Sequence, residues 1–502
     1  MAFLDHSSYQ LPTGQPMAGQ ARISLPDDQI DALLKLEEAS EESARPPRKP
    51  ARKQPKQIER LAEDMYAQHT EDSGIWAKSK EGSLVYRWNG WHWEEIEQEP
   101  AEADAMRWLR RHYPDQACQR KAAACCCTAR LTLPWLPPVP NGRCLISCLD
   151  GWLELIGDRF VRIAPDKTIG VTHAVQAQLG ALPLGADYIP APVSGRFAEY
   201  LGISQPDESV RAMIQEYIGY TLLPHSFLNL QVAMVFLGDG ADGKGLLAGL
   251  VRRLHRRTCG MNLKALDGFG AEGLIGATLA LVDEGPSRGV IDDERIKTMI
   301  SGDALDINRK HRIAVTYRPQ AKWIILCNTA PKFCSSGLAI HRRFLYAPWT
   351  ASLPDDKRIA NLEDLIADTE LKGVLDWALA GALALVKRGK FEIPDPAVVL
   401  KQSAAQSADT VLGWKAEVDP RIAPDVQTPK NEIYGDYVDW CKEQGRGSVG
   451  AETFWMRLRK YLGVTDDEQW VGQRITINGK RVLTVRLLIH QAPIDDNEPP
   501  PF

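Results

Sequence analysis

The stretch Gly238-Asp-Gly-Ala-Asp-Gly-Lys-Gly245 determines how the middle of this chain is interpreted. An apolar run over residues 232–237, typical of a buried strand, precedes it, and the apolar spacing over residues 246–254 predicts a helix after it. Its glycines and lysine match the G-x-x-x-x-G-K-[ST] pattern, in which backbone N–H groups, a helix N-terminus and the lysine ammonium converge on a polyphosphate. The alternative is a glycine turn with an unrelated lysine, but the order strand, loop, helix favours a phosphate site.

The predicted phosphate loop consists of Gly238, Asp239, Gly240, Ala241, Asp242, Gly243, Lys244, Gly245 and Leu246. One member departs from the pattern, because Gly245 stands where a Ser or Thr hydroxyl normally binds Mg²⁺. We therefore expect a nucleotide site with weaker metal binding, in which a water replaces the missing hydroxyl.

Composition limits the class of protein. A chain of 502 residues is long enough for about three domains. The formal net charge of −5 creates no overall basic field, so contacts to nucleic acid have to come from local patches. No apolar run approaches the roughly 20 residues that span a bilayer, and the N-terminus carries no secretory pattern, so the sequence predicts a cytoplasmic protein without a membrane partner.

Six of the ten cysteines cluster in the first third of the chain. They are Cys118, Cys125, Cys126, Cys127, Cys144 and Cys148. No pair has the C-x-x-C spacing of zinc knuckles, and the triple cysteine follows three alanines, as on a helix face of small residues. Buried reduced thiols are favoured over a zinc site.

A second apolar strand, predicted over residues 278–284, ends in two carboxylates. Asp283 is expected to hold Mg²⁺, directly or through water, and Glu284 to polarise the water that attacks the γ-phosphate. Acidic residues also end ordinary solvated strands. A phosphate loop about 40 residues upstream favours the functional interpretation.

Residues 305–317 alternate apolar and polar side chains on both sides of a basic tip, which predicts a hairpin. The tip residues are Arg309, Lys310, His311 and Arg312. They are candidates to bind the phosphates of single-stranded nucleic acid, and a solvated charged turn is the alternative.

A third strand, predicted over residues 322–328, ends at Asn328, an amide that is able to sense the γ-phosphate of ATP. Farther on, Arg342 and Arg343 precede another apolar strand over residues 344–347. An arginine there is a candidate finger that reaches the nucleotide of a neighbouring subunit, and an ordinary surface salt bridge is the alternative.

In this order and spacing, the phosphate loop, acidic strand, basic hairpin, asparagine strand and downstream arginine resemble the motor of superfamily 3 DNA helicases. The layout over about residues 80–490 is similar to the helicase half of phage, plasmid and poxvirus primase-helicases; Asp150, the stretch Gln215-Glu-Tyr-Ile-Gly-Tyr220 and Trp377 add to the likeness. The resemblance implies a multidomain α/β chain with an AAA+ P-loop core, a helical collar and a C-terminal winged helix. It also implies a homo-hexameric ring, in the cytoplasm of a bacterial host, that moves on single-stranded DNA, normally 3′ to 5′, with ATP and Mg²⁺ as cofactors.

The resemblance assigns roles to individual residues. Lys244 binds phosphate, Asp283 and Glu284 form the Walker B pair, Asn328 is the first sensor, Arg343 is the finger with Arg342 as its alternative, and Lys310 with His311 contacts DNA in the pore. The expected domains are a basic linker (1–64), a mixed α/β domain (65–190), the collar (191–228), the motor (229–393), a connector (394–409), a winged-helix-like domain (410–492) and a tail (493–502).

Outside the motor, the patterns are less specific. Residues 86–93 predict an aromatic hairpin around Asn-Gly, and residues 144–155 a second hairpin-like pair. The tryptophans are expected to pack rather than to stack on bases. Helices over 431–441 and 451–462 and a hairpin over 474–488 have the order of a winged helix, which offers contacts to duplex origin DNA or to a protein.

The sequence thus predicts an ATP-driven DNA helicase of a phage or mobile genetic element that acts at replication initiation. A separate primase or polymerase is a candidate partner. Two alternatives stay open: a DNA-binding assembly factor in which Gly245 impairs hydrolysis, and an AAA+ remodeller of protein complexes, which would not need Lys310 and His311.

Overall fold

The computed structural model describes residues 57–80, 84–263, 266, 270–283, 293–310, 312–331, 338–351, 359–418, 428–463, 470–477 and 480–487. The chain divides into two compact units, Met1–Leu61 and Ala62–Phe502, and apart from the start of the first helix the described residues belong to the second. Residues 1–56 of the expected basic linker and the expected tail over 493–502 lie outside the described residues.

Three helices and a small sheet begin the described part of the chain. They are α2 (Gln57–Asp72), β1 (Trp76–Lys78), β2 (Val85–Trp88), β3 (Trp93–Glu95), α3 (Gln98–His112) and α4 (Gln119–Thr132), with a short 3-10 helix, η1 (Pro114–Gln116), between α3 and α4. Trp88 pairs with Trp93 in antiparallel strands, which confirms the hairpin predicted over 86–93. Its turn is longer than the two-residue Asn-Gly type, because Asn89 Oδ1 accepts the N–H groups of Trp91 and His92 (both 3.0 Å). The Trp88 and Trp93 rings pack together, with centroids 5.9 Å apart, as the packing interpretation predicts.

A four-stranded antiparallel sheet follows. It contains β4 (Cys144–Cys148), β5 (Gly151–Ile156), β6 (Arg159–Ile163) and β7 (Asp187–Tyr188). The pairing of β4 with β5 confirms the hairpin predicted over 144–155. Burial raises the pKa of the Cys144 thiol to about 12 and that of Cys125 on α4 to about 11. Because zinc binds the thiolate, these environments favour protonated thiols. Cys125, Cys144 and Cys148 are buried, as the sequence predicts, whereas Cys118 and Cys127 are exposed and the prediction of buried thiols is wrong for them.

The central sheet contains five parallel strands. They are β8 (Ala233–Gly238), β9 (Thr258–Gly260), β10 (Leu279–Val282), β13 (Lys322–Cys327) and β14 (Phe344–Trp349). Their order is β14-β8-β13-β10-β9, and every neighbouring pair is parallel. Parallel strands are buried on both faces and therefore appear in the sequence as continuous apolar runs. The predicted mixed α/β class is confirmed.

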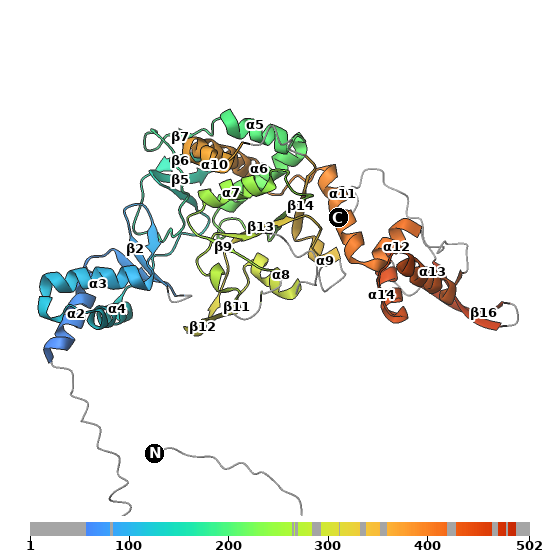
Figure 1. Ribbon diagram of the computed structural model, residues 1–502, viewed down its shortest axis with the longest axis horizontal. Helices are drawn as coiled ribbons and strands as arrows, with labels where there is room; N and C mark the ends of the chain where they lie inside the picture. Colours follow the sequence, from blue (N-terminus) through green and yellow to red (C-terminus); the bar gives the residue numbers. More distant parts are fainter. Residues whose placement is uncertain are drawn as a thin grey trace, which may run out of the picture. The chain divides into compact units, whose positions relative to one another are not determined.

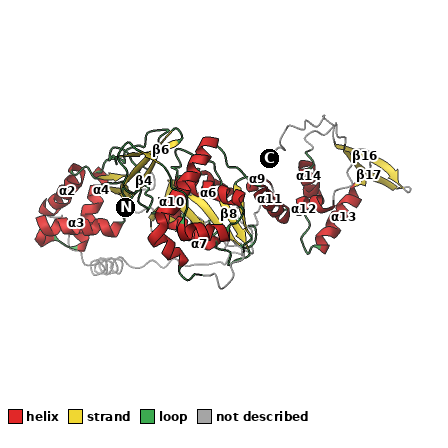
Figure 2. Ribbon diagram, turned by 90° about the horizontal axis from the view of Figure 1, so that it is seen from above, coloured by secondary structure: helices red, strands yellow, loops and turns green. Residues whose placement is uncertain are grey.

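Helices cover both faces of this sheet (Figure 1). They are α5 (Gly195–Ser204), α6 (Glu208–Leu222), α7 (Lys244–Leu254), α8 (Asp293–Ser301), α9 (Leu338–His341) and α10 (Leu362–Arg388), with the 3-10 helix η2 (Glu272–Leu274) between β9 and β10. Successive strand residues point to opposite faces, so Phe236 packs in the core with α6, α7 and α10, whereas Val235 packs with Ile296 and Met299 of α8. Figure 2 again shows α6, α7 and α10 beside β8.

The helix α6 crosses α10 at very short range because both helices have glycine at the crossing. A Cβ on Gly219 would lie 2.3 Å from the carbonyl oxygen of Ala378, and one on Gly381 would lie 2.3 Å from that of Gln215. α6 begins after Asp207, whose carboxylate accepts backbone N–H groups of the first turn. The two helices therefore pack with their backbones in close contact at this crossing.

The C-terminal region is mostly helical. It contains α11 (Asp395–Ala408), α12 (Thr410–Val418), β15 (Thr428–Pro429), α13 (Lys430–Glu443), α14 (Ala451–Tyr461), β16 (Trp470–Ile477) and β17 (Lys480–Leu487). The two predicted helices and the hairpin are confirmed, and the turn at 478–479 lies outside the described residues. The expected connector over 394–409 is itself the helix α11, which packs against β14.

Among the described helices, none is both long and apolar enough to cross a membrane.

Lys322, the first residue of β13, is a buried lysine that makes stability depend on pH. Its side chain is 3% exposed, and its Nζ donates to Tyr220 Oη (2.8 Å) and to the carbonyl oxygen of Leu228 (3.2 Å). Burial lowers the pKa of this ammonium to about 7. Between pH 7 and the unfolded pKa near 10.4, the unfolded chain binds the proton that the folded chain has lost, so stability rises with pH in this window.

We expect the unfolding free energy of the wild type, relative to that of Lys322→Met, to rise by about 2 kcal/mol from pH 7 to pH 9. Urea unfolding of both proteins at several pH values measures this difference. Comparing the two proteins cancels the titration of all other groups. A difference that does not change with pH would mean that Lys322 stays charged in the folded chain.

Candidate nucleotide site

The predicted phosphate loop joins the carboxyl end of β8 to the first residue of α7. Three of its residues have positive φ: Gly240 (102°), Ala241 (54°) and Gly243 (93°). Two features favour glycine at position 243: its positive φ, and the lack of room for a side chain, since a Cβ there would lie 2.5 Å from Ser204 Oγ of α5. The tight turn brings Lys244 back toward the start of the loop.

Lys244 points into its own loop. Its Nζ donates to the carbonyl oxygen of Gly238 (3.1 Å) and to both carboxylate oxygens of Asp242 (3.0 and 3.3 Å). Lys244 is 8% exposed and Asp242 is 2% exposed. The loop therefore holds a buried ammonium close to several backbone N–H groups, which is the donor set that a polyphosphate needs.

A residue of α5 supports the loop. The hydroxyl of Tyr200 on α5 donates to the carbonyl oxygen of Gly243 (2.7 Å), and burial raises the pKa of Tyr200 well above its usual value. Sequence reasoning missed this contact. No local signal links Tyr200 to the loop, because the two are 43 residues apart.

Two other predicted site residues lie on the same edge of the sheet. Asp283 directly follows β10, and Asn328 directly follows β13; both are exposed. β13 lies between β8 and β10, with Cys327 opposite Leu237 and Val282 opposite Ile325. The carboxyl ends of the three strands therefore meet beside the phosphate loop. Glu284 lies outside the described residues.

The site offers what Mg²⁺ and a nucleotide require, apart from the hydroxyl at position 245. Asp283 is a carboxylate on the same edge as the loop, and oxygen ligands are what Mg²⁺ prefers. A Cβ on Gly245 would meet nothing within 4 Å, so packing does not exclude a hydroxyl there. The residues present fit a nucleotide with a metal ion that keeps most of its water ligands.

The candidate fingers lie at the opposite edge of the sheet. Arg342 and Arg343 precede β14, and Phe344 pairs with Ala233 at the amino end of β8. Arg343 is half-buried, donates to the side-chain oxygen of Gln231 (2.7 Å), and has its pKa lowered by burial and by the charge of Arg342. Arg342 is exposed. Neither arginine belongs to the nucleotide site of its own chain.

The basic hairpin is also remote from the phosphate loop. β11 (Leu305–Arg309) pairs with β12 (Arg312–Tyr317), which confirms the predicted hairpin. Its base leads directly into the amino end of β13, and Figure 1 shows it on the far side of the sheet from α6 and α7. Lys310 is exposed at the tip, where its backbone N–H donates to the Glu272 carboxylate (3.2 Å). His311 lies outside the described residues. For Arg312 the structure describes the backbone but not the side chain.

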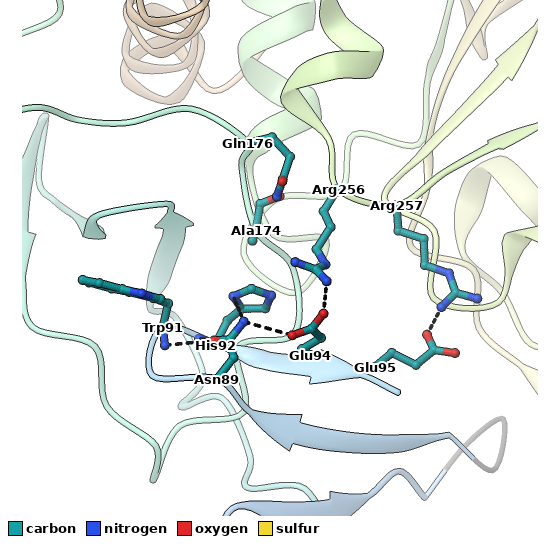
Figure 3. A network of polar contacts seen from close by, with 9 residues as sticks. All are labelled: Asn89, Trp91, His92, Glu94, Glu95, Ala174, Gln176, Arg256 and Arg257. Carbon is teal, nitrogen blue, oxygen red and sulfur yellow. Dashed lines mark hydrogen bonds and ion pairs between the residues drawn. The ribbon is translucent and has the colours of Figure 1, made fainter. Parts of the chain in front are cut away.

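A polar network joins the segment after α7 to the first small sheet (Figure 3). Arg256 forms an ion pair with Glu94, and Arg257 forms one with Glu95 on β3. His92 lies beside this network, and burial together with the nearby Arg256 charge lowers its pKa to about 4. Sequence reasoning missed these pairs, because adjacent arginines and adjacent glutamates give no sign of which partner they meet.

Comparisons with known proteins give two findings. The family described as a family of unknown function (DUF5906) matches residues 236–343, the part of the chain from β8 to the candidate fingers. Three solved apo structures of the C-terminal region of NrS-1 are similar to this chain at 14% sequence identity, with TM-scores of 0.41, 0.38 and 0.36. In each comparison the matched region covers 69% of this chain and 96% of the NrS-1 chain. No curated protein matches the chain significantly.

Proposed function

We propose that this chain is an ATP-driven DNA helicase motor of a phage or mobile genetic element, built on an AAA+ P-loop core. The observation that supports it most is the meeting of three polar strand ends at one edge of the sheet. Lys244, Asp283 and Asn328 come from three separate segments, and the strand order gathers them where a nucleotide and its metal would lie. A glycine turn with an unrelated lysine would not need this arrangement.

The proposed roles follow from charge and position. Lys244 would bind the outer phosphates, Asp283 would hold Mg²⁺, and Asn328 together with Glu284 would orient the attacking water. Mg²⁺ supplies neutralisation of the charge that develops on the phosphates. Positive φ values at Gly240, Ala241 and Gly243 give the loop the tight turn that brings Lys244 back toward Gly238.

The opposite edge of the sheet would serve a neighbouring subunit and DNA. In a homo-hexameric ring, an arginine before β14 would reach the nucleotide bound by the next subunit. We favour Arg342 for this role, since Arg343 is half-buried and bound to Gln231 of its own chain. Lys310, at the exposed tip of the hairpin, would bind the phosphates of single-stranded DNA in the pore.

The C-terminal helices and hairpin have the order of a winged helix and would bind duplex origin DNA or a partner such as a separate primase or polymerase. One observation favours a second candidate function. Because Gly245 supplies no hydroxyl to the metal, the chain would instead be a hydrolysis-impaired assembly factor that binds DNA and nucleotide without turnover. A protein-remodelling AAA+ machine is less favoured, because protein remodelling does not require a basic hairpin tip that binds DNA.

The decisive experiment measures ATP hydrolysis with and without single-stranded DNA for the wild type, Lys310→Ala and Lys387→Ala, while oligomer size is monitored. We expect DNA to stimulate the wild type and Lys387→Ala, which loses an exposed lysine at the end of α10. Lys310→Ala should keep its basal rate and lose the stimulation. If none of the three proteins hydrolyses ATP while all still bind DNA, the assembly factor is favoured. If DNA stimulates all three proteins equally, the hairpin does not contribute to DNA binding.

A further inference from the structure

The carboxylate of Asp242 lies inside the phosphate loop. Its Oδ2 accepts the backbone N–H of Gly240 (3.4 Å), and its Oδ1 accepts that of Lys244 (3.2 Å). Both oxygens also accept the Lys244 ammonium, at 3.0 and 3.3 Å. A Cβ on Gly238 would lie only 2.2 Å from Oδ2, so the carboxylate fills the space between the start and the end of the loop.

These donors are the groups that a phosphate loop offers to a nucleotide. The carboxylate is an anion with two acceptor oxygens, so it satisfies in part the same N–H groups and the same ammonium. Its side chain is only 3% exposed, and that of Lys244 is 10% exposed, which makes this a buried ion pair rather than a solvent-screened one. A phosphate that approaches Lys244 therefore meets a negative charge already in place.

We propose that Asp242 is an internal competitor for nucleotide phosphate, and that its carboxylate has to leave the loop before a nucleotide binds. This inference rests on the proposed function, since it takes the loop to be a nucleotide site. Asp242 then lowers the affinity for nucleotide. It also favours product release, because the carboxylate returns to the donors as the phosphates leave.

A purely structural role makes a different prediction. The contact from Lys244 N–H to Oδ1 closes an Asx-type turn just before α7, whose N-cap is Gly243, and an amide oxygen accepts this N–H as a carboxylate does. Asn at position 242 keeps the shape and the turn but carries no charge. Asp242→Asn therefore separates competition, which needs the charge, from support of the turn, which does not.

The test is equilibrium binding of ADP and of pyrophosphate to the full chain, with Lys244→Ala as the variant without a site. The matched control is Asp158→Asn, because Asp158 is an exposed carboxylate in the turn between β5 and β6, outside the phosphate loop. We expect Asp242→Asn to bind both ligands about tenfold more tightly than the wild type, equivalent to about 1.4 kcal/mol, with slower ADP release. Asp158→Asn should stay within about twofold of the wild type.

A second variant, Asp242→Ser, tests whether the effect is specific to asparagine, since serine also supports a turn of this kind but is too short to fill the loop. It should also bind both ligands more tightly than the wild type. Equal or weaker binding by both Asp242 variants overturns the inference. In that case the proposed function is still supported, provided that the wild type binds ADP and Lys244→Ala does not. If no protein binds either ligand, both proposals fail, and if only the Asp242 variants bind, both are supported.

Discussion

Replacing Lys244 with alanine is expected to lower the kcat/KM of ATP hydrolysis by at least about 100-fold. The ammonium is buried beside the loop N–H groups, and charge-assisted hydrogen bonds of this kind contribute about 1.5–3 kcal/mol each. Loss of about 3 kcal/mol of transition-state stabilisation corresponds to roughly two orders of magnitude in rate. Phosphate release measured at saturating Mg²⁺ gives the value directly.

The variant also leaves the Asp242 carboxylate without its counter-charge, so the loss has two physical sources. The double variant Lys244→Ala with Asp242→Asn separates them, because it removes the orphaned charge while still lacking the ammonium. We expect the double variant to stay inactive. Recovery to more than a tenth of the wild-type rate would mean that Lys244 serves mainly to neutralise Asp242.

The second large effect concerns folding. Gly381→Ala is expected to lower the unfolding free energy by about 3 kcal/mol and the midpoint of thermal unfolding by roughly 3 °C. The added methyl group would lie 2.3 Å from the Gln215 carbonyl oxygen and 2.8 Å from the Glu216 backbone nitrogen. These are backbone atoms inside a helix, so α6 and α10 have to move apart, and that movement disturbs the packing of the two helices.

Gly373→Ala is the matched control on the same helix. A Cβ on Gly373 would meet nothing within 4 Å, and alanine favours a helix interior over glycine by roughly 0.5–1 kcal/mol. We therefore expect Gly373→Ala to melt at or slightly above the wild-type temperature. Similar midpoints for the two alanine variants would show that the helix crossing relaxes at little cost.

Local patterns predicted much of this molecule. The segment from β8 through the phosphate loop to α7 is contiguous, and its apolar run, glycines and helical spacing each depend only on near neighbours. The hairpins at 86–93, 144–155 and 305–317 are local for the same reason. The exception is α11, which was expected to be a connector. Its small and polar residues give only a weak apolar face at helical spacing, although the helix packs against β14.

Long-range features could not be predicted in this way. The strand order depends on which segments bury each other's apolar faces, so the position of β13 between β8 and β10 has no signature in any single segment. The contact of Tyr200 with Gly243 and that of Arg343 with Gln231 join residues 43 and 112 positions apart. Asp242 illustrates a different limit, since its role depends on which way one short side chain turns.

The strand order has a mechanical consequence. β13 carries Asn328 at its carboxyl end, and its amino end continues from β12 through four residues, so one strand of about 20 Å spans the distance between the two edges of the sheet. It contains no glycine, all its residues are buried, and the Tyr217 hydroxyl holds the carbonyl oxygen of Trp323 at 2.6 Å. A strand confined in this way is expected to resist bending. A shift imposed on its Asn328 end would therefore be transmitted along β13 to the base of the hairpin.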